Sequence, residues 1–462
     1  MPEKLTIDQV LVAVLKADPR NARTHTKQQV RQIGDSIQEF GFVNPILIDE
    51  ANRIIAGHAR RDAAAQLGLE TVPVIRLSHL TEHQKRALAI ADNKLAENAG
   101  WNEEVLAQEL KILSEVVVDF DVTITGFATA EIDVLIEGLA PTDDPSADEI
   151  PDPEEAENIV VRRGDLFHLG RHRLLCGDAT CDADFEALMS YRTAQMVITD
   201  PPYNIPIHGN VCGLGRIKHP DFVMAAGEMS AAEFTAFLER AFSNLAAHSI
   251  EGSIHFVFMD WRHLPEILAA GEAAYSELKQ LIAWVKTNAG MGSFYRSQHE
   301  LVLAFKNGQA PHINNFELGQ HGRHRSNVWT YAGMNSLGPD RLDELRMHPT
   351  VKPVALVADA ILDCSRRGGV ILDAFAGSGT TLIAAEKTGR RAYAMELDPR
   401  YVQTAIRRWQ AFTGDEAVHA ETGLTLVGME EARAQAPSSG FADPSAGGSP
   451  AAPEGMEATH VG

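Results

Sequence analysis

The chain has 462 residues and is 45% hydrophobic, which predicts two or three globular domains with ordinary apolar cores. Its four cysteines (Cys176, Cys181, Cys212 and Cys364) form no CxxC pattern, so we expect neither a disulfide framework nor a zinc site, and a reducing, cytoplasmic setting is favoured. The formal net charge of −22 argues against a basic surface over the whole chain, and the lack of a signal-peptide pattern or a long apolar run argues against export and membrane insertion.

The first 78 residues are predicted to form a small α+β domain. Apolar residues recur at helical spacing in 26–41, which ends in a glycine, so this stretch predicts a helix. Short apolar runs on either side of a turn predict two strands within 45–57, followed by a helix over 58–68 and a third strand over 71–77. Residues 79–140 have a mainly helical pattern and are treated as a separate segment.

Residues 7–78 resemble the N-terminal domain of ParB-like proteins. In partition ParB proteins this module binds a nucleotide through arginines at the start of the helix after a glycine turn, and a helix N-terminus suits an anion. Gly57 and Arg60 match that pattern, but His58 and Ala59 stand where the family has an acidic and a basic residue. The resemblance therefore leaves a nucleotide contact open.

An alternative is that the N-terminal domain docks onto another part of the molecule or contacts DNA, with Arg60 and Arg61 in solvent. The helix-turn-helix of a full partition protein is not evident, although helices within 81–140 could serve as one. The sequence also leaves open whether the chain forms a homodimer.

Two segments are predicted to lack a packed core. Residues 142–158 hold eight acids and no base, so 141–158 is expected to be an extended acidic linker. Residues 413–462 lead into a region rich in glycine, serine, proline and alanine and are expected to be a disordered tail. Because part of the negative charge lies on these segments, it says little about a binding face elsewhere.

The central part, 159–412, alternates apolar β-branched runs with amphipathic stretches, which predicts a doubly wound, Rossmann-like α/β domain covered by helices on both faces. Ligands of such a fold bind beyond the carboxyl ends of the strands. We expect strands at 194–199, 253–259, 280–286, 300–306, 370–375 and 391–397. We expect helices at 230–248, 353–365, 380–389 and 399–412.

A glycine-containing turn follows the strand that begins at residue 370. Gly377 and Gly379 allow backbone conformations and a close ligand approach that a side chain would block. A helix begins at once at Thr380, and the next strand ends in Glu396, an acid suited to the hydroxyls of a ribose. No lysine follows the second glycine, so this is not a P-loop, and a tight turn without a ligand is an equally open interpretation.

A second unusual stretch is MVITDPPYN, residues 196–204, where an apolar strand ends abruptly in an acid, two prolines and an aromatic ring. Proline stiffens the chain and cannot continue a strand ladder. By itself the stretch could be a strand terminator or a PPxY-type peptide ligand.

Taken together, DPPY (Asp200–Tyr203) and DAFAGSGTT (Asp373–Thr381) resemble an amino-group DNA methyltransferase that uses S-adenosylmethionine, in the motif order of the β group. HPTVKP, residues 348–353, resembles the family motif before the cofactor strand, and residues 284–308 resemble the strands that approach the target-recognition region. The resemblance covers about residues 160–412.

The resemblance implies that DPPY acts on a base amine. Asp200 and a backbone carbonyl in the rigid Pro201–Pro202 turn would accept hydrogen bonds from the amine and favour a localised lone pair. Tyr203 would stack on the base, which must first leave the duplex. No metal is required. Within the family DPPY favours adenine N6, with cytosine N4 the second enzymatic possibility and a non-catalytic ParB-like DNA-binding or regulatory protein the third.

The resemblance also assigns a cofactor site. Residues of the glycine turn would line the methionine end of the cofactor: Phe375, Gly377, Ser378, Gly379 and Thr380. Asp373, which opens the motif, is also expected to belong to the cofactor site. Glu396 would accept from the ribose, and Asp178 would approach the adenine ring, or else serve as the N-cap of the next helix. Thr350 and Lys352 would meet the cofactor carboxylate or brace the loop.

Double-stranded DNA is the expected partner, and residues 287–347 are the expected recognition region. Arg323 and Arg325 are basic and Trp329 is aromatic, a combination that suits phosphate contact and stacking. A surface loop with solvated arginines is the alternative. The glycine-containing loop 204–223 after DPPY could close over the target base.

Overall fold

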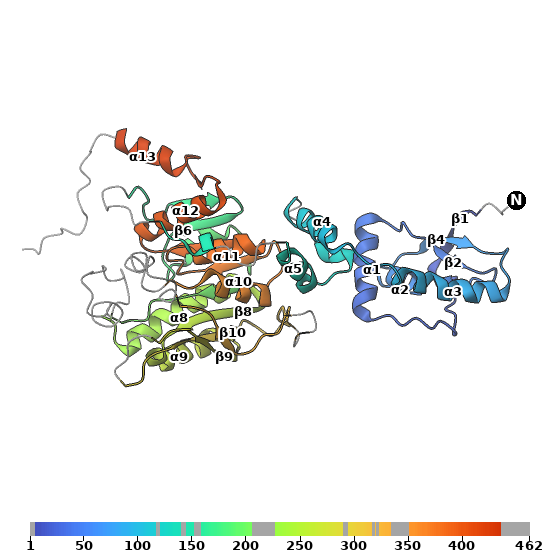
Figure 1. Cartoon of the computed structure of the whole chain (residues 1–462), viewed down its shortest axis with the longest axis horizontal. Helices are drawn as coiled ribbons and strands as arrows, with labels where there is room; N and C mark the ends of the chain where they lie inside the picture. Colours follow the sequence, from blue (N-terminus) through green and yellow to red (C-terminus); the bar gives the residue numbers. More distant parts are fainter. Residues whose placement is uncertain are drawn as a thin grey trace, which may run out of the picture.

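The computed structural model describes residues 5–116, 121–139, 145–151, 159–205, 227–289, 294–316, 319, 323–333 and 351–435. In these ranges the chain forms a four-stranded sheet near the N-terminus and a ten-stranded sheet in the remainder, with a helical segment between them (Figure 1). None of the helices in these ranges is both long and apolar enough to cross a bilayer.

The N-terminal sheet has the order β1-β4-β2-β3, formed by Ile7–Leu11, Thr71–Arg76, Ile46–Ile48 and Ile54–Ala56. Helices α1 (Lys27–Phe40) and α2 (His58–Gln66) complete the domain. The predicted helices and strands are confirmed, and β1 is an edge strand that the sequence interpretation missed. The inward-facing strand residues, among them Ile46, Ile48 and Val74, are fully buried.

Three helices follow the N-terminal domain, as the pattern of 79–140 predicted: α3 (Glu82–Glu97), α4 (Glu103–Val116) and α5 (Thr129–Glu137). Asp133 of α5 is fully buried and accepts from Arg390 Nη1 at 2.9 Å and Arg390 Nη2 at 2.7 Å. Arg367 Nε lies 2.9 Å from the same carboxylate. Because a buried charge needs its partners, this ion pair attaches α5 to the large α/β domain.

The large sheet has the order β11-β9-β10-β8-β7-β12-β13-β6-β5-β14. Its centre is parallel and consists of β8 (Ser249–Met259), β7 (Ala194–Thr199), β12 (Val370–Asp373), β13 (Arg391–Glu396) and β6 (His172–Cys176). Antiparallel pairings extend it through β10 (His299–Lys306) and β9 (Glu277–Val285) on one side, and through β5 (Leu166–Leu169) and β14 (Val418–His419) on the other. The short β11 (Val328–Thr330) joins β9 in parallel.

Helices cover both faces of this sheet, so the doubly wound prediction is confirmed (Figure 1). Met196 and Ile198 pack into one core with α10 (Val354–Cys364), α11 (Thr380–Thr388) and α12 (Pro399–Thr413). Val197 points to the other core, with α6 (Asp182–Met189), α8 (Ala231–Ala247) and α9 (Leu264–Ala274). This alternation is what a strand buried on both faces requires, and it explains the continuous apolar run.

The strand order places a topological switch point between β7 and β12. The chain leaves β7 for β8 on one side, whereas it leaves β12 for β13 on the other side. The carboxyl ends of these two neighbours therefore open a crevice that no crossover helix covers. The DPPY stretch follows β7 and the glycine turn follows β12, so the fold brings the two motifs to this crevice.

Two expectations about unstructured segments need correction. Within the supposed linker, Ala147 is 3% exposed and belongs to the main core, and its carbonyl accepts from Arg408 Nη2 at 2.9 Å. Within the supposed tail, β14 pairs with β5, and α13 (Leu426–Gln435) buries Leu426 completely. One or a few buried apolar residues are enough to dock each segment on a core that other elements have built. The low-complexity residues 436–462 lie outside the described part.

Candidate active site

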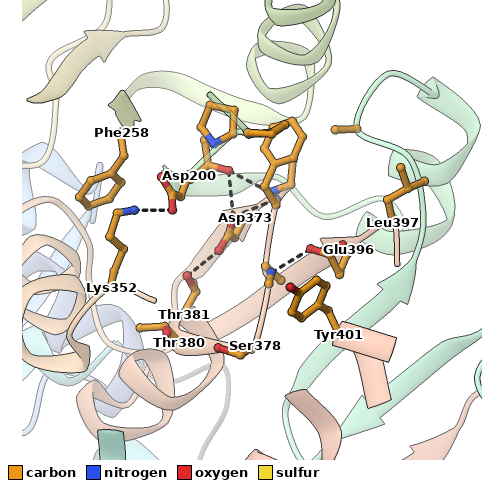
Figure 2. A pocket seen from close by; sticks show the side chains of 18 of the residues that line it. Asp200, Phe258, Lys352, Asp373, Ser378, Thr380, Thr381, Glu396, Leu397 and Tyr401 are labelled. Carbon is orange, nitrogen blue, oxygen red and sulfur yellow. Dashed lines mark hydrogen bonds and ion pairs between the residues drawn. The ribbon is translucent and has the colours of Figure 1, made fainter. Parts of the chain in front are cut away.

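The end of β12 is fixed by a buried carboxylate. Asp373 Oδ1 accepts from Thr199 Oγ1 at 2.8 Å, and Asp373 Oδ2 accepts from Thr381 Oγ1 at 2.6 Å. Burial raises the pKa of Asp373 to about 6, against the opposing effect of the Thr381 hydrogen bond. Asp373 thereby joins β7, the glycine turn and α11, so its role in this structure is to hold the two motifs together (Figure 2).

The two glycines of the turn have different roles. Gly377 has φ +51°, and a Cβ atom built on it would meet nothing within 4 Å, although Gly377 lines the cavity. A side chain there would enter the space that a ligand needs. Gly379 has φ +84° and is the N-cap of α11, and a Cβ on it would lie 2.8 Å from the Ala405 Cβ. Gly379 is therefore required for helix packing rather than for lining the cavity.

Glu396 ends β13 and faces the same turn. Its Oε2 accepts from the Gly377 backbone N–H at 2.9 Å, and its Oε1 accepts from the Asp398 N–H at 2.9 Å. Burial raises the pKa of Glu396 to about 7, although both backbone hydrogen bonds act to lower it. Each carboxylate oxygen keeps a further lone pair, so Glu396 can still accept from ligand hydroxyls in the cavity (Figure 2).

The remaining predicted cofactor residues that the structure describes also line the cavity: Asp178, Phe375, Ser378 and Thr380. Asp178 Oδ1 accepts from the Thr180 N–H at 2.8 Å, and the N-cap of α6 is Cys181, so the alternative role of Asp178 as a helix cap is wrong. The hydroxyls of Ser378 and Thr380 accept from the buried Arg408, which sets the shape of the turn. Thr350 lies outside the described residues.

The DPPY stretch forms the opposite wall of the cavity. Asp200, Pro201, Pro202 and Tyr203 all line it, directly after β7. The Tyr203 hydroxyl donates to Asp200 Oδ1 at 2.7 Å, so the ring and the carboxylate have a fixed relative position. Burial raises the pKa of Asp200, an effect that Glu300 increases and the Lys352 ammonium opposes.

Asn204 completes this corner of the site. It has φ +51°, and its side chain accepts from the backbone N–H groups of Gly227 at 3.1 Å and Met229 at 3.2 Å. These contacts join Asn204, the first residue of the segment predicted to close over a target base, to residues that follow that segment. Residues 206–223 of that segment lie outside the described part.

Lys352 is placed differently from the sequence interpretation, which directed it toward a cofactor carboxylate or the loop. Its Nζ lies 2.5 Å from Asp200 Oδ2 (Figure 2). The same Nζ lies 3.3 Å from Glu300 Oε2. Lys286 Nζ lies 2.5 Å from Glu300 Oε1. Glu300 and Lys286 were not recognised as site residues. Their only signal was their position within residues 284–308, the segment of strands that approach the recognition region.

The predicted DNA contacts through Arg323 and Arg325 must be corrected. Arg323 is 9% exposed and donates to Asp363 Oδ1 at 3.0 Å and Asp359 Oδ1 at 3.1 Å. Arg325 Nε donates to Asp363 Oδ2 at 2.8 Å. Both guanidinium groups are thus committed to carboxylates of α10, which also excludes the alternative of solvated arginines.

Trp329 is likewise unavailable for stacking on a base. It is 3% exposed and packs against Phe256, with 5.6 Å between ring centroids. The aromatic residues that remain exposed in the described part of the expected recognition region are Phe294 and Tyr295, which keep 87% and 82% of their surface. They lie in the connection between β9 and β10, which begins directly after Val285.

The N-terminal domain presents its glycine turn as the resemblance implied, with Gly57 at φ +101° directly before α2. Arg60 does not point into solvent. Its Nη1 donates to the backbone carbonyls of Asn44 at 2.8 Å and Pro45 at 2.9 Å. The interpretation in which Arg60 and Arg61 are both solvated is therefore wrong for Arg60.

Comparison with known families matches three successive parts of the chain. Residues 2–94 match the family described as ParB N-terminal domain, and residues 104–163 match the ParB-methyltransferase HTH domain. Residues 194–407 match the family described as DNA methylase. The helix-turn-helix that was not evident in the sequence thus overlaps α4, α5 and the acidic segment.

The curated relatives are of two kinds, a ParB-like protein and DNA methyltransferases. The chain is 50% identical over 86 residues to the ParB-like nuclease domain-containing protein YnaK of Escherichia coli K12, covering 19% of this chain and 99% of YnaK. It is 28% identical over 246 residues to the type II methyltransferase M2.DpnII of Streptococcus pneumoniae, covering 49% of this chain and 86% of the relative. It is 35% identical over 112 residues to the DNA adenine methyltransferase YhdJ of Escherichia coli K12, covering 24% of this chain and 34% of YhdJ.

Among solved structures, the chain matches a putative DNA modification methylase of Thermus thermophilus in complex with S-adenosyl-L-methionine. The identity is 24%, the match covers 53% of this chain and 96% of that one, and the TM-score is 0.36.

Proposed function

The chain belongs to the DNA methylase family, with a ParB N-terminal domain and a ParB-methyltransferase HTH domain ahead of the methylase part, and we propose that it methylates the N6 amine of adenine in duplex DNA. A single observation carries this proposal. The DPPY stretch and the glycine turn line one cavity at the switch point of the sheet, with Asp200 on one wall and Glu396 on the other. Asp200 as the amine acceptor and Glu396 as the ribose acceptor would then face one space, which supports the proposal.

The cavity fits S-adenosylmethionine on its own features. Gly377 leaves open space where a side chain would protrude, and Glu396 offers acceptor oxygens beside it. Leu397 and Tyr401 add apolar and aromatic walls for the adenosine. When bound, S-adenosylmethionine supplies a methyl group whose carbon passes from sulfur to the amine nitrogen, the sulfur keeps the bonding electrons, and the nitrogen gives up one proton.

The residues of the chain act on the target amine. Asp200 accepts one N–H, and a backbone carbonyl of the rigid Pro201–Pro202 turn accepts the other, so that the nitrogen lone pair is directed toward the methyl carbon. Tyr203, held by its hydrogen bond to Asp200, gives the base a stacking surface. The base has to leave the duplex to reach this wall, because its amine is otherwise paired.

Adenine is favoured over cytosine N4 by the aspartate that opens DPPY and by the name of the relative YhdJ, a DNA adenine methyltransferase. Cytosine N4 is the alternative substrate. Sequencing that maps modified bases in DNA from cells expressing the chain, together with mass spectrometry of the nucleosides, separates the two. N6-methyladenine at a defined site would support the proposal, and N4-methylcytosine would show that cytosine is the substrate instead.

Purified wild-type protein and Asp200→Ala form the matched test of catalysis. Transfer of labelled methyl groups to mixed-sequence duplex DNA is expected for the wild type and is expected to be lost in the variant, with S-adenosylmethionine affinity retained. Activity of Asp200→Ala equal to the wild type would remove Asp200 from its assigned role. No transfer by the wild type would favour a DNA-binding or regulatory protein.

DNA contact is assigned to the side of the domain that carries Phe294 and Tyr295. Their exposed rings, 4.5 Å apart, lie in the connection between β9 and β10. Lys286 follows β9 directly and contacts Glu300 of β10, which in turn contacts Lys352 of the active-site wall. Aromatic side chains of this kind stack on unpaired bases without sequence preference. The ParB and HTH parts would add further DNA contacts before the methylase domain.

A further inference from the structure

A cluster of alternating charges lies at the DPPY wall of the cavity, and the motifs assign no role to two of its members, Glu300 and Lys286. We call it the acid–lysine cluster: Asp200, Lys352, Glu300 and Lys286. Lys352 Nζ lies 2.5 Å from Asp200 Oδ2 and 3.3 Å from Glu300 Oε2, and Lys286 Nζ lies 2.5 Å from Glu300 Oε1. Two ammonium groups therefore alternate with two carboxylates, and their formal charges cancel.

The surroundings of Lys352 are poor in water. Its side chain is 8% exposed, and its Nζ lies 5.1 Å from the Phe258 ring centroid and 5.5 Å from that of Tyr203. A buried ammonium group without carboxylate partners is strongly unfavourable. Burial lowers the pKa of Lys352, but Asp200 and Glu300 together raise it above the ordinary value, so Lys352 stays charged between them.

Both oxygens of Asp200 already accept a hydrogen bond. The Tyr203 hydroxyl donates to Oδ1 at 2.7 Å, and the Lys352 ammonium donates to Oδ2. Under the proposed function, the target amine is a third donor that arrives at the same carboxylate. The Lys352 ammonium and the target amine are both N–H donors of similar size, so they compete for Oδ2.

Resting on the proposed function, we propose that Lys352 stands in for the target amine: it occupies Asp200 before the base enters and moves onto Glu300 when the amine takes its place. Glu300 is suited to receive it, because its Oε2 lies 3.3 Å from the ammonium while Lys286 holds its other oxygen. The exchange moves no charge out of the pocket. Glu300 and Lys286 are positioning residues in this scheme, since they act through Lys352.

The pKa directions agree with this arrangement. Burial acts to raise the pKa of Glu300, but Lys352 and Lys286 hold it at about 2, so Glu300 is an anion over the working pH range. Asp200 has its pKa raised by burial and by Glu300, and Lys352 is the cation that opposes this. Tyr203 and Asp373 are the other titratable groups that act on this carboxylate, and neither brings a positive charge.

Removal of Lys352 and removal of Glu300 should therefore have different effects on the reaction. In Lys352→Met, Asp200 loses its cation, its pKa rises further, and the acidic limb of the pH–rate profile moves to higher pH. In Glu300→Gln, Lys352 has Asp200 as its remaining carboxylate partner in the cluster and is held there, so the target amine is blocked without such a move of the profile. The double variant should relieve the block.

The experiment uses the full chain, labelled S-adenosylmethionine and mixed-sequence duplex DNA over a pH series. Glu300→Gln is expected to lower kcat about tenfold or more, equivalent to about 1.4 kcal/mol of activation free energy. The double variant, Glu300→Gln with Lys352→Met, is expected to have a kcat at least about threefold higher than that of Glu300→Gln alone at pH above about 8. The effects of the two substitutions would then not be additive. Glu300→Asp should restore part of the rate. Lys279→Met and Glu277→Gln, an exposed pair on β9, are the matched controls.

A readout without methyl transfer separates this inference from the proposed function. Binding of 2′-deoxyadenosine to the cofactor-free protein, followed by saturation-transfer NMR, should weaken in Glu300→Gln and recover in the double variant. That order holds whether or not the wild type transfers methyl groups. A double variant that binds and reacts no better than Glu300→Gln, with all thermal midpoints within a few degrees, would overturn the exchange of Lys352 between the two carboxylates.

Discussion

Thr199 and Asp373 lie 174 residues apart in the chain, and their side chains meet at 2.8 Å between neighbouring strands of the large sheet. Each residue stands directly beside one motif, because Asp200 follows Thr199 and the glycine turn follows Asp373. The hydrogen bond therefore sets the relative position of the amine acceptor and the cofactor turn. Thr199 Oγ1 also accepts from the Ala374 N–H at 3.3 Å, so it contacts both the carboxylate and the backbone of the turn.

Thr199→Val is expected to destabilise the protein, since it keeps the shape of the side chain but leaves Asp373 without one of its donors. Loss of a hydrogen bond to a buried polar group costs about 1–3 kcal/mol. Unfolding in urea should show this loss, and the affinity for S-adenosylmethionine should fall as the turn loses its anchor. Thr235→Val on the exposed side of α8 is the control, because its hydroxyl bonds only within the helix. Unchanged stability and affinity in Thr199→Val would contradict the role of this contact.

Gly377→Asp is expected to abolish S-adenosylmethionine binding while the domain remains folded. The new side chain would enter the open space in the cavity, in a left-handed backbone conformation that an aspartate tolerates better than most residues. Isothermal titration calorimetry measures the affinity directly. Gly414→Ala is the matched control, because Gly414 also has positive φ and open space but lies at the end of α12, away from the cavity. This variant should be less stable than the wild type, with unchanged affinity for S-adenosylmethionine. Retained affinity in Gly377→Asp would exclude this turn as the cofactor site.

These outcomes depend on features that could be read from the sequence, and the reason is that both motifs are local. The apolar run that ends in Thr199 is a strand buried on both faces. The glycines mark positions of positive φ, and the need for a positive φ arises from the local turn between strand and helix. Long-range partners are different. Nothing near Lys352 in sequence indicates that Asp200, 152 residues away, would hold its ammonium.

The same reasoning explains the errors. Arg323 and Arg325 have the composition of a DNA-binding loop, but the carboxylates that neutralise them come from α10, which for Arg323 lies 36 and 40 residues later. Ala147 and Leu426 lie in segments of low apolar content, yet each fills a place on a core built by other elements. Burial is decided by the whole fold, and residue type in a short window gives little information about it.

Binding of S-adenosylmethionine is expected to strengthen as the pH rises through about 7. The folded-state pKa of Glu396 is raised to about 7 from an ordinary 4.5, so below pH 7 the ligand meets a protonated carboxyl group. Ribose hydroxyls that donate to the carboxylate favour the ionised form, and binding should therefore release a proton. Calorimetry in two buffers with different ionisation enthalpies measures that release, and Glu396→Gln should abolish it.

The stability of the ligand-free protein should change in the opposite sense. Between pH 4.5 and 7 the folded state binds more protons at Glu396 than the unfolded state does, so this residue makes the protein less stable as the pH rises through that window. The thermal midpoint of Glu396→Gln should accordingly depend less on pH than that of the wild type. An equal pH dependence in the two proteins would mean that the Glu396 carboxyl titrates normally.

Phe294→Ala with Tyr295→Ala is expected to weaken DNA binding, whereas Arg323→Gln is expected to lower stability instead. The two rings are exposed beside the active-site wall, and loss of base stacking costs about 1–3 kcal/mol for each aromatic contact. Arg323 is buried against Asp359 and Asp363, so its loss takes one of two cations from these carboxylates, which keep Arg325, and removes no phosphate contact. Fluorescence anisotropy with duplex DNA over a salt series distinguishes the two, because losing a phosphate contact would reduce the slope of log K against log salt. A reduced slope in Arg323→Gln, with full stability, would restore Arg323 to the DNA surface.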